Sequence, residues 1–162
     1  MYDTILLPTD GSDGMDTVTE HGLTLADRFD AEIHVLHVVD DRAYASVPDD
    51  ARDRIRETLE ADAEDATKAV AERSLEAEIP VVREIRWGNP PASIIAYTRE
   101  NEVDLIVMGT HGRSGYERYL LGSVAEKVVR AASVPVLTVN IFDQPAETGE
   151  ESGVAAPETD LR

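Results

Sequence analysis

The sequence contains no cysteine, which excludes a disulfide framework, a thiolate zinc site and a cysteine nucleophile. It also lacks a long apolar run, since no stretch approaches the roughly 18 to 20 apolar residues that a membrane span needs. The N-terminus enters a strand-like pattern directly, without the basic segment and apolar core of a secretory signal. Together these absences predict a cytoplasmic protein.

Basic residues are scarce, and lysine is almost missing, with Lys68 and Lys127 as the only two. The 15 Lys and Arg residues face 33 Asp and Glu residues, which gives a formal net charge of −18. This charge disfavours binding to nucleic acid or to an anionic membrane, because both attract basic patches. Two interpretations remain open. One is a halophilic source, where salt screens the self-repulsion, and the other is an acidic surface with an acidic tail.

The 162 residues suit one domain, with apolar patterns in a regular strand–helix order. Strands are predicted at 2–8, 31–39, 80–86, 103–108 and 134–139, and helices at 13–29, 51–75, 89–101 and 124–132. Residues 40–50 read as a loop. Residues 1–142 form the domain, and the acidic, aperiodic residues 143–162 are predicted to be a disordered tail. The alternation predicts an α/β fold with a parallel, doubly wound sheet and helices on both faces.

A glycine-rich segment follows the fourth predicted strand. It reads Gly109-Thr-His-Gly112, then nine residues, then Gly122-Ser123, and it leads into the last helix. A strand, a glycine loop and a helix N-terminus together bring free backbone N–H groups to one place, which suits phosphate. We expect these glycines to reach positive φ and to spare room for a ligand. Ser123 and Glu126 have the spacing of a capping box.

The spacing G-x2-G-x9-G-S, with Ile5-Leu-Leu-Pro-Thr-Asp10-Gly-Ser near the N-terminus, closely resembles the universal stress protein family in its ATP-binding branch. The resemblance covers about residues 1 to 140. It implies a five-stranded sheet of order 3-2-1-4-5, with a Rossmann-like fold of the adenine nucleotide alpha hydrolase type. In that order strands 1 and 4 are neighbours, so Asp10 and Gly109 meet at the switch point where such sheets bind ligands.

The resemblance also implies which residues contact ATP. Pro8, Thr9 and Asp10 line the adenosine side, and the backbone of Val38 meets the adenine edge. The full set of expected cofactor-binding residues is Pro8, Thr9, Asp10, Val38, Met108, Gly109, Gly112, Arg113, Gly122, Ser123 and Val124. Arg113 and Arg118 are equally consistent with closing over the phosphates and with compensating the negative charge of the acidic surface. Asp10 is a plausible water-mediated ligand for Mg²⁺, and no dedicated protein metal site is visible.

Signatures of efficient catalysis are missing. There is no G-x-x-x-x-G-K-[ST] motif and no lysine near the glycine segment. Asp10 and His111 are the nearest possible bases, and neither has an identifiable partner. The favoured function is an ATP-binding stress-response or signalling module. The alternatives are a slow ATPase or adenylyl-transferring enzyme, and a scaffold whose nucleotide site is vestigial.

The last strand, which begins at Val134, would form an edge of the predicted sheet. An apolar edge tends to associate unless it is covered, and universal stress proteins commonly pair these strands across a two-fold axis. The resemblance therefore implies a homodimer that buries Val136, Leu137, Thr138 and Val139, with Ile141 and Phe142 as further contributors.

Overall fold

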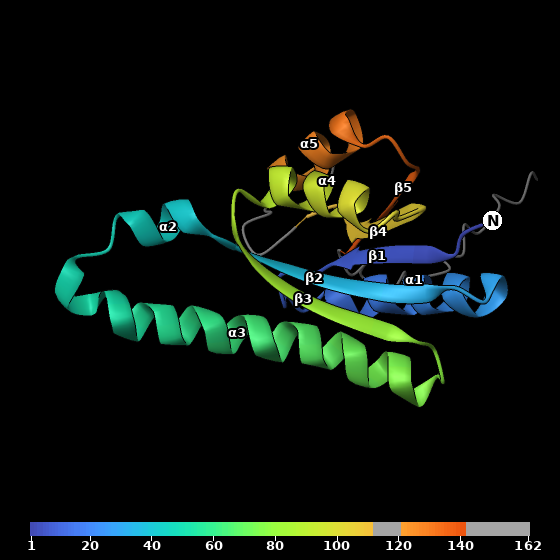
Figure 1. Cartoon of the computed structure of the whole chain (residues 1–162), viewed down its shortest axis with the longest axis horizontal. Coiled ribbons are helices and arrows are strands. Elements are labelled where there is room, and N and C mark those ends of the chain that lie inside the picture. Colours follow the sequence, from blue (N-terminus) through green and yellow to red (C-terminus); the bar gives the residue numbers. More distant parts are fainter. Residues whose placement is uncertain (112–120, 142–162) are drawn as a thin grey trace, which may run out of the picture.

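Five parallel strands form one sheet in the order β3-β2-β1-β4-β5, which confirms the predicted architecture (Figure 1). The computed structural model describes residues 1–111 and 121–141. The strands are β1 (Thr4–Pro8), β2 (Glu32–Asp40), β3 (Val81–Gly88), β4 (Leu105–Gly109) and β5 (Val136–Val139). The predicted tail at 143–162 lies outside the described residues, as does Phe142. Because every strand points the same way, all five carboxyl ends lie at one edge of the sheet.

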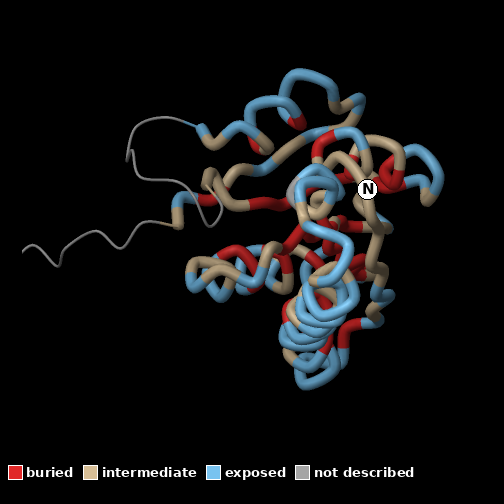
Figure 2. Tube along the Cα trace, turned by 90° about the vertical axis from the view of Figure 1, so that its left-hand side faces the viewer, coloured by how far each residue is buried: buried red, intermediate tan, exposed pale blue. Residues whose placement is uncertain are grey.

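Helices cover both faces of the sheet. They are α1 (Met15–Phe29), α2 (Asp41–Ala45), α3 (Asp49–Glu76), α4 (Pro90–Glu100) and α5 (Ser123–Ala131). Val18 of α1 and Val70 of α3 belong to the core on one face, whereas Ile94 of α4 and Val128 of α5 belong to the core on the other. Buried positions concentrate in the strands and in the helix faces that touch them (Figure 2).

The central strand β1 explains why the two cores are separate. Ile5, Leu6 and Leu7 are all fully buried, as expected for a strand covered on both faces. Side chains alternate along a strand, so Ile5 and Leu7 enter the core under α1 and α3, while Leu6 enters the core under α4 and α5. The continuous apolar run in the sequence therefore has a direct structural cause.

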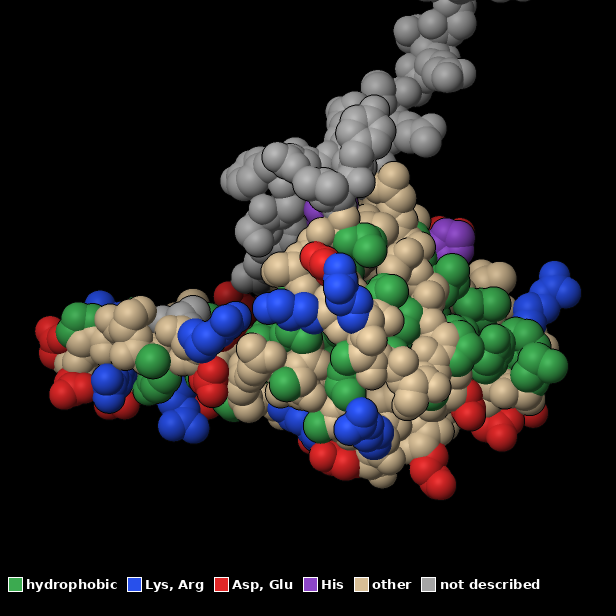
Figure 3. Space-filling model, turned by 90° about the horizontal axis from the view of Figure 1, so that it is seen from above, with side chains coloured by type: hydrophobic (Ala, Val, Ile, Leu, Met, Phe, Trp, Pro, Cys, Tyr) green, Lys and Arg blue, Asp and Glu red, His purple; other side chains and the backbone are tan. Residues whose placement is uncertain are grey.

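Helix α3 extends well past the sheet. Its 28 residues span about 42 Å at 1.5 Å per residue, while the eight residues of β3 span about 26 Å. The first half of α3 and α2 form a projecting arm on which acidic and basic side chains are interspersed (Figure 3). The helical periodicity of the sequence predicts that Ile55 and Leu59 belong to the buried stripe of this helix. That prediction is wrong, because Ile55 is exposed and Leu59 only half-buried. That part of the helix lies beyond the strands that would cover it.

The predicted loop at 40–50 contains the short helix α2. Its N-cap is Asp40, whose carboxylate accepts a hydrogen bond from the Arg42 N–H. The helix is five residues long, too short to carry the periodic apolar pattern that identifies longer helices. The N-cap residue Asp40 was therefore the main feature of the sequence that could have predicted α2.

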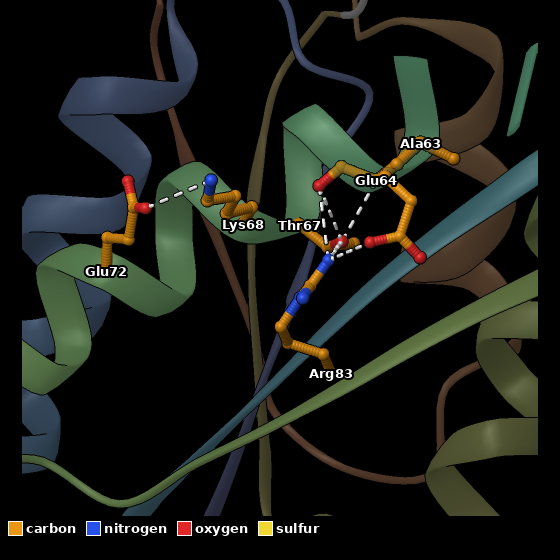
Figure 4. A network of polar contacts seen from close by, with 6 residues as sticks. All are labelled: Ala63, Glu64, Thr67, Lys68, Glu72 and Arg83. Atoms are coloured by element: carbon orange, nitrogen blue, oxygen red, sulfur yellow. Dashed lines mark hydrogen bonds and ion pairs between the residues drawn. The ribbon is translucent and has the colours of Figure 1, made fainter. Parts of the chain in front are cut away.

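The second half of α3 is fastened to the edge strand β3 by Arg83. Its guanidinium donates to the hydroxyl of Thr67 at 2.9 Å and pairs with the carboxylate of Glu64 (Figure 4). Thr67 in turn donates to the carbonyl of Ala63 within its own helix. The charge of Arg83 thus lies between the helix and the strand, which agrees with the predicted edge position of β3.

Within the described residues, no helix combines the length and the apolar composition needed to cross a membrane.

Candidate functional site

A cavity of about 510 Å³ opens at the carboxyl ends of the strands, beside the N-termini of α4 and α5. It lies where β1 borders β4 and the strand order reverses, the usual ligand position in open α/β sheets. Its lining comprises Pro8, Thr9, Asp10, Met15, Leu36, Val38, Asp40, Pro90, Ile94, Met108, Gly109, Thr110, His111, Gly122, Ser123, Val124 and Ala125.

The structure brings nine of the eleven predicted cofactor-binding residues to this one cavity. They are Pro8, Thr9, Asp10, Val38, Met108, Gly109, Gly122, Ser123 and Val124. The other two, Gly112 and Arg113, lie outside the described residues, as does Arg118. Segments about a hundred residues apart in the sequence therefore line one cavity.

A tight turn after β1 presents Asp10 to the cavity. The Thr9 N–H donates to the carbonyl of Leu36 at 2.9 Å and continues the pairing with β2. The side chains of Thr9 and Asp10 then accept hydrogen bonds from the N–H groups of Gly11 and Ser12, at 3.2 and 3.0 Å. Gly11 has φ of 72°, a left-handed conformation that favours glycine. Local hydrogen bonds thus fix the position of the Asp10 carboxylate.

The glycine segment begins where β4 ends. Thr110 donates its N–H to the carbonyl of Val139 at 2.9 Å, and its own carbonyl accepts from the Gly122 N–H at 2.7 Å. These two bonds hold the start of the segment against its end and against β5. Both ends of the motif therefore lie at the cavity, although the residues between them are not described.

The expectation that Gly109 and Gly122 need positive φ is wrong. Within the described residues, the glycines at positive φ are Gly11 and Gly88, and Gly122 is extended with φ of −60°. Gly109 is small for a different reason. A Cβ there would lie 3.2 Å from both the carbonyl oxygen of His111 and a methyl carbon of Ile141. Close packing of the backbone, not backbone handedness, accounts for glycine at this position.

Helix α5 points its N-terminus at the cavity. Gly122 is the N-cap, and the first bond of the helix runs from the Glu126 N–H to the Gly122 carbonyl at 2.9 Å. The amide N–H groups of Ser123, Val124 and Ala125 precede this bond and have no acceptor within the helix. Together with the helix dipole they form a place that favours an anion.

The predicted capping box at Ser123 is wrong. The N-cap is Gly122, which has no side chain to cap the helix, and Ser123 is the first residue inside the helix. A side chain at the first helical position does not have the N-cap geometry that reaches the N3 amide. Glu126 pairs instead with Arg130 at 3.0 Å.

The other wall of the cavity comes from β2 and α4. Leu36, Val38 and Asp40 alternate along β2, so their side chains share the face that α4 covers. Asn89 caps α4 by accepting from the Ala92 N–H at 3.1 Å, which sets Pro90 and Ile94 against the same wall. The sequence-based prediction named only Val38 here, although the period of two on the strand pointed to Leu36 and Asp40.

Asp40 at the end of β2 carries a fixed negative charge. Its carboxylate accepts the Arg42 backbone N–H at 3.0 Å, the Arg42 Nε at 3.1 Å and the Arg42 Nη2 at 2.8 Å. Hydrogen bonding to the Arg42 guanidinium holds the pKa of the Asp40 carboxyl below its usual value. Asp40 is therefore ionised at neutral pH.

The cavity has two chemically different ends. Leu36, Val38, Pro90 and Ile94 make the end beside β2 and α4 largely apolar. Gly109, Thr110 and the α5 N-terminus supply backbone N–H groups at the other end. An apolar wall facing a cluster of N–H donors fits a ligand with a flat apolar part and an anionic part.

A second hollow, of about 390 Å³, lies between α1 and α3. Its charged lining consists of Asp13, Asp16, Asp62 and Asp65 with a single basic residue, Arg73. Arg73 already contacts Asp16, its Nη1 lying 2.9 Å from the Asp16 carbonyl oxygen. Four carboxylates make this hollow unsuitable for an anionic ligand. Within the described residues, no group of three or more acidic or histidine side chains is arranged to hold a metal ion.

A five-stranded doubly wound sheet with a crevice at its switch point defines the class of α/β proteins with the adenine nucleotide alpha hydrolase-like fold. The chain belongs to the universal stress protein family, whose model matches residues 1–140. A universal stress protein of Methanocaldococcus jannaschii, MJ0531, is 38% identical over 140 residues, which are 86% of this chain and 82% of the relative. The solved structure of the protein MJ0577 superposes with a TM-score of 0.77 at 29% identity, covering 89% of this chain and 99% of the other.

Two further solved structures of the family contain nucleotides. One is a universal stress protein in complex with cAMP, with a TM-score of 0.64 and 21% identity over 87% of this chain and 98% of the other. The second is a universal stress protein of Archaeoglobus fulgidus in complex with dAMP, with a TM-score of 0.64 and 19% identity over 85% of this chain and 97% of the other. Homologues of this fold therefore bind adenine nucleotides.

Proposed function

We propose that this protein binds ATP in the cavity between β1, β2, β4 and α5 and acts as a nucleotide-dependent stress-response or signalling module. The observation that carries the proposal is the junction of an apolar wall and three helix-terminal amides without an acceptor in their own helix, in one cavity of about 510 Å³. The cAMP and dAMP complexes of homologues support an adenine nucleotide as the ligand.

In this proposal the nucleotide lies across the carboxyl edge of the sheet. The adenine packs between Val38 and Ile94, and the ribose lies near Asp10. The phosphates reach Gly109 and the amides of the α5 N-terminus, where Gly112 and Arg113 of the motif are also expected to act. Mg²⁺ would be held by phosphate oxygens and water, with Asp10 as an indirect ligand.

The proposal favours binding over catalysis. Among the described lining residues, the titratable side chains are Asp10, Asp40 and His111. Asp10 accepts from the Ser12 N–H at 3.0 Å, and His111 Nδ1 lies 3.0 Å from the Thr110 hydroxyl. Asp40 is engaged by Arg42 at the apolar end, away from the expected phosphates. None of these groups is arranged as an identified base for an attacking water.

Calorimetric titration with ATP, ADP, AMP, adenosine and pyrophosphate tests the proposal. Both ends of the cavity contribute to binding, so ATP should bind more tightly than adenosine or pyrophosphate alone. Absence of ATP binding would refute the proposal. Rapid turnover of ATP with added Mg²⁺ would favour an enzyme over a binding module.

We also propose that the protein is a homodimer through β5. Among the described residues, this strand is an edge of the sheet and pairs with β4 alone, and it exposes Leu137 to 38%. Leu137 and the neighbouring Val136 and Thr138 would be covered by the partner strand, while Val139 is already buried within one chain. Light scattering at micromolar protein in high salt should give the dimer mass, and Leu137→Glu should give the monomer mass. A monomeric wild type would refute this part.

A third inference concerns the solvent in which the protein works. The net charge of −18 and the near absence of lysine support adaptation to high salt and a halophilic source.

A further inference from the structure

We propose that Asp40 determines which purine the cavity accepts, by taking a hydrogen bond from the exocyclic 6-amino group of adenine and disfavouring a 6-keto purine. The inference rests on the proposed function, because it assigns a base-reading role within the same cavity. Asp40 is not among the residues that the glycine motif or the turn at Asp10 identifies. It is a feature of the second strand and its short following helix.

The position of Asp40 follows from the register of β2. Leu36, Val38 and Asp40 lie at i, i+2 and i+4, so all three face the wall that α4 covers. Leu36 and Val38 are apolar and suit the faces and edges of a base. Asp40 is the last residue of the strand and brings the one carboxylate at the apolar end. A polar group at the end of an otherwise apolar wall is how binding sites fix the orientation of a flat ligand.

The hydrogen bonds of Asp40 leave one acceptor position for a ligand. A carboxylate offers about four acceptor positions, two on each oxygen. The Arg42 backbone N–H and Nε both bind Oδ1, and Arg42 Nη2 binds Oδ2. One position on Oδ2 therefore remains. The side chain keeps 33% of its surface exposed, so the carboxylate is reachable and is not enclosed by Arg42.

Arg42 also fixes the state of this acceptor. The guanidinium lowers the pKa of the Asp40 carboxyl, so the group accepts hydrogen bonds and donates none at neutral pH. The bidentate contact restricts the orientation of the carboxylate as well. The cavity thus presents a preorganised acceptor at its base-binding end.

This acceptor distinguishes purines by their 6-substituent. Adenine carries an amino group, which donates, whereas hypoxanthine and guanine carry a keto oxygen, which only accepts. A keto oxygen placed against the Asp40 carboxylate would leave two acceptors facing each other, and the ring N1–H beside it could replace the lost hydrogen bond only if the base moved away from that position. A hydrogen bond to a charged group is worth enough to change affinity about ten-fold or more, and partial exposure places the effect here near ten-fold.

The test compares ATP, ITP and 2′-deoxyATP as ligands of the full chain. Wild type should bind ATP about ten-fold more tightly than ITP. Asp40→Asn should remove most of this preference, because an amide both donates and accepts and can serve either base. Asn is also a good N-cap, so α2 should persist, which circular dichroism and thermal unfolding check. Asp41→Asn removes the same charge one residue further on, outside the cavity lining, and should keep the wild-type preference.

The outcomes separate this inference from the proposed function. Equal affinity of wild type for ATP and ITP, with clear ATP binding, would overturn the role of Asp40 and leave the proposed function intact. A change in the ATP to 2′-deoxyATP ratio in Asp40→Asn, with an unchanged ATP to ITP ratio, would mean that Asp40 reads the ribose and would also overturn it. No binding of any of the three nucleotides to wild type would overturn both.

Discussion

Gly22 in the middle of α1 lies so close to Leu7 of β1 that a Cβ on residue 22 would be 2.7 Å from Leu7 Cδ2. Real Cβ atoms do not approach a neighbour this closely, so the missing side chain lets the helix lie directly on the central strand. Leu7 is fully buried and surrounded by core, which limits its room to move aside. The contact holds α1 under the turn that presents Asp10.

Gly22→Ala should therefore lower the free energy of unfolding, by about 1–3 kcal/mol. The sign of the change is informative, because helix propensity alone predicts the opposite: alanine is about 1 kcal/mol more favourable than glycine in an exposed helix. Urea denaturation of Gly22→Ala, Leu7→Val and the double variant measures the coupling, and the smaller Leu7→Val side chain should relieve part of the cost. Thr24→Ala on the exposed side of the same helix is the control and should change stability by about 0.5 kcal/mol or less. Stabilisation by Gly22→Ala would contradict the tight contact.

Ser123→Pro tests the backbone amides at the cavity without removing the helix. Ser123 is the first residue of α5, where proline is favoured, and the extended Gly122 before it, with ψ of 156°, suits a following proline. The substitution removes one N–H and one hydroxyl. Ser123→Ala removes only the hydroxyl and serves as the matched control. We expect ATP affinity to fall by about three- to ten-fold more in Ser123→Pro than in Ser123→Ala, with unchanged circular dichroism. Equal affinities of the two variants would show that the Ser123 amide does not bind phosphate.

Tyr97→Phe should change both stability and its dependence on alkaline pH. Tyr97 is almost fully buried and its hydroxyl lies 2.8 Å from His34 Nδ1, so losing the hydroxyl should cost about 1–2 kcal/mol at neutral pH. Burial raises the pKa of the Tyr97 phenol, so the unfolded chain loses this proton first as pH rises. The contribution of Tyr97 to stability is then complete below about pH 10 and declines as pH rises through the folded pKa.

Urea midpoints measured from about pH 7 to pH 11 check this sign. The difference in stability between wild type and Tyr97→Phe should shrink above about pH 10, because only wild type loses the contribution of the buried phenol. A difference that stays constant over the whole range would contradict a raised pKa for Tyr97.

Stability should rise with salt. The net charge of −18 means that the excess negative side chains repel one another. KCl shortens the screening length of this repulsion from about 10 Å at 0.1 M to about 3 Å at 1 M. Asp53 and Glu57 are exposed like charges four residues apart on α3, a destabilising arrangement. Thermal unfolding of wild type in increasing KCl should show a rising midpoint. Asp53→Asn with Glu57→Gln should raise the midpoint at low salt and reduce its salt dependence. A wild type no more stable in molar KCl than in dilute buffer would refute adaptation to high salt.

The strands were predictable because burial on two faces leaves continuous apolar runs, as at Ile5-Leu6-Leu7. The order of the sheet followed from the family resemblance, and it alone brought Asp10 and Gly109 together. The sequence did not reveal where along α3 the packing against the sheet ends. Ile55 has the periodicity of a core residue, but α3 outruns the sheet there, and a local pattern carries no information on the length of the neighbouring strand.

Within the site, residue identities were easier to predict than the physical reasons for them. Gly109 lines the cavity, but the reason for its small size is the packing of the Ile141 side chain, a contact between segments far apart in the sequence. Ser123 missed the N-cap by one residue, which is the usual uncertainty of a helix boundary. Asp40 shares a strand face with Val38, so the alternation of side chains along β2 could have predicted it as a lining residue, but no sequence motif marks it.

The position of β1 between β2 and β4 has a consequence for synthesis on the ribosome. This first strand gains its β2 neighbour early, but its other edge stays open until residues 105–109 have emerged. The amides of α5 arrive later still, with residues 123–125. A chain released before that point would have the apolar half of the crevice without the helix amides, so the proposed nucleotide site would be complete only in nearly full-length molecules.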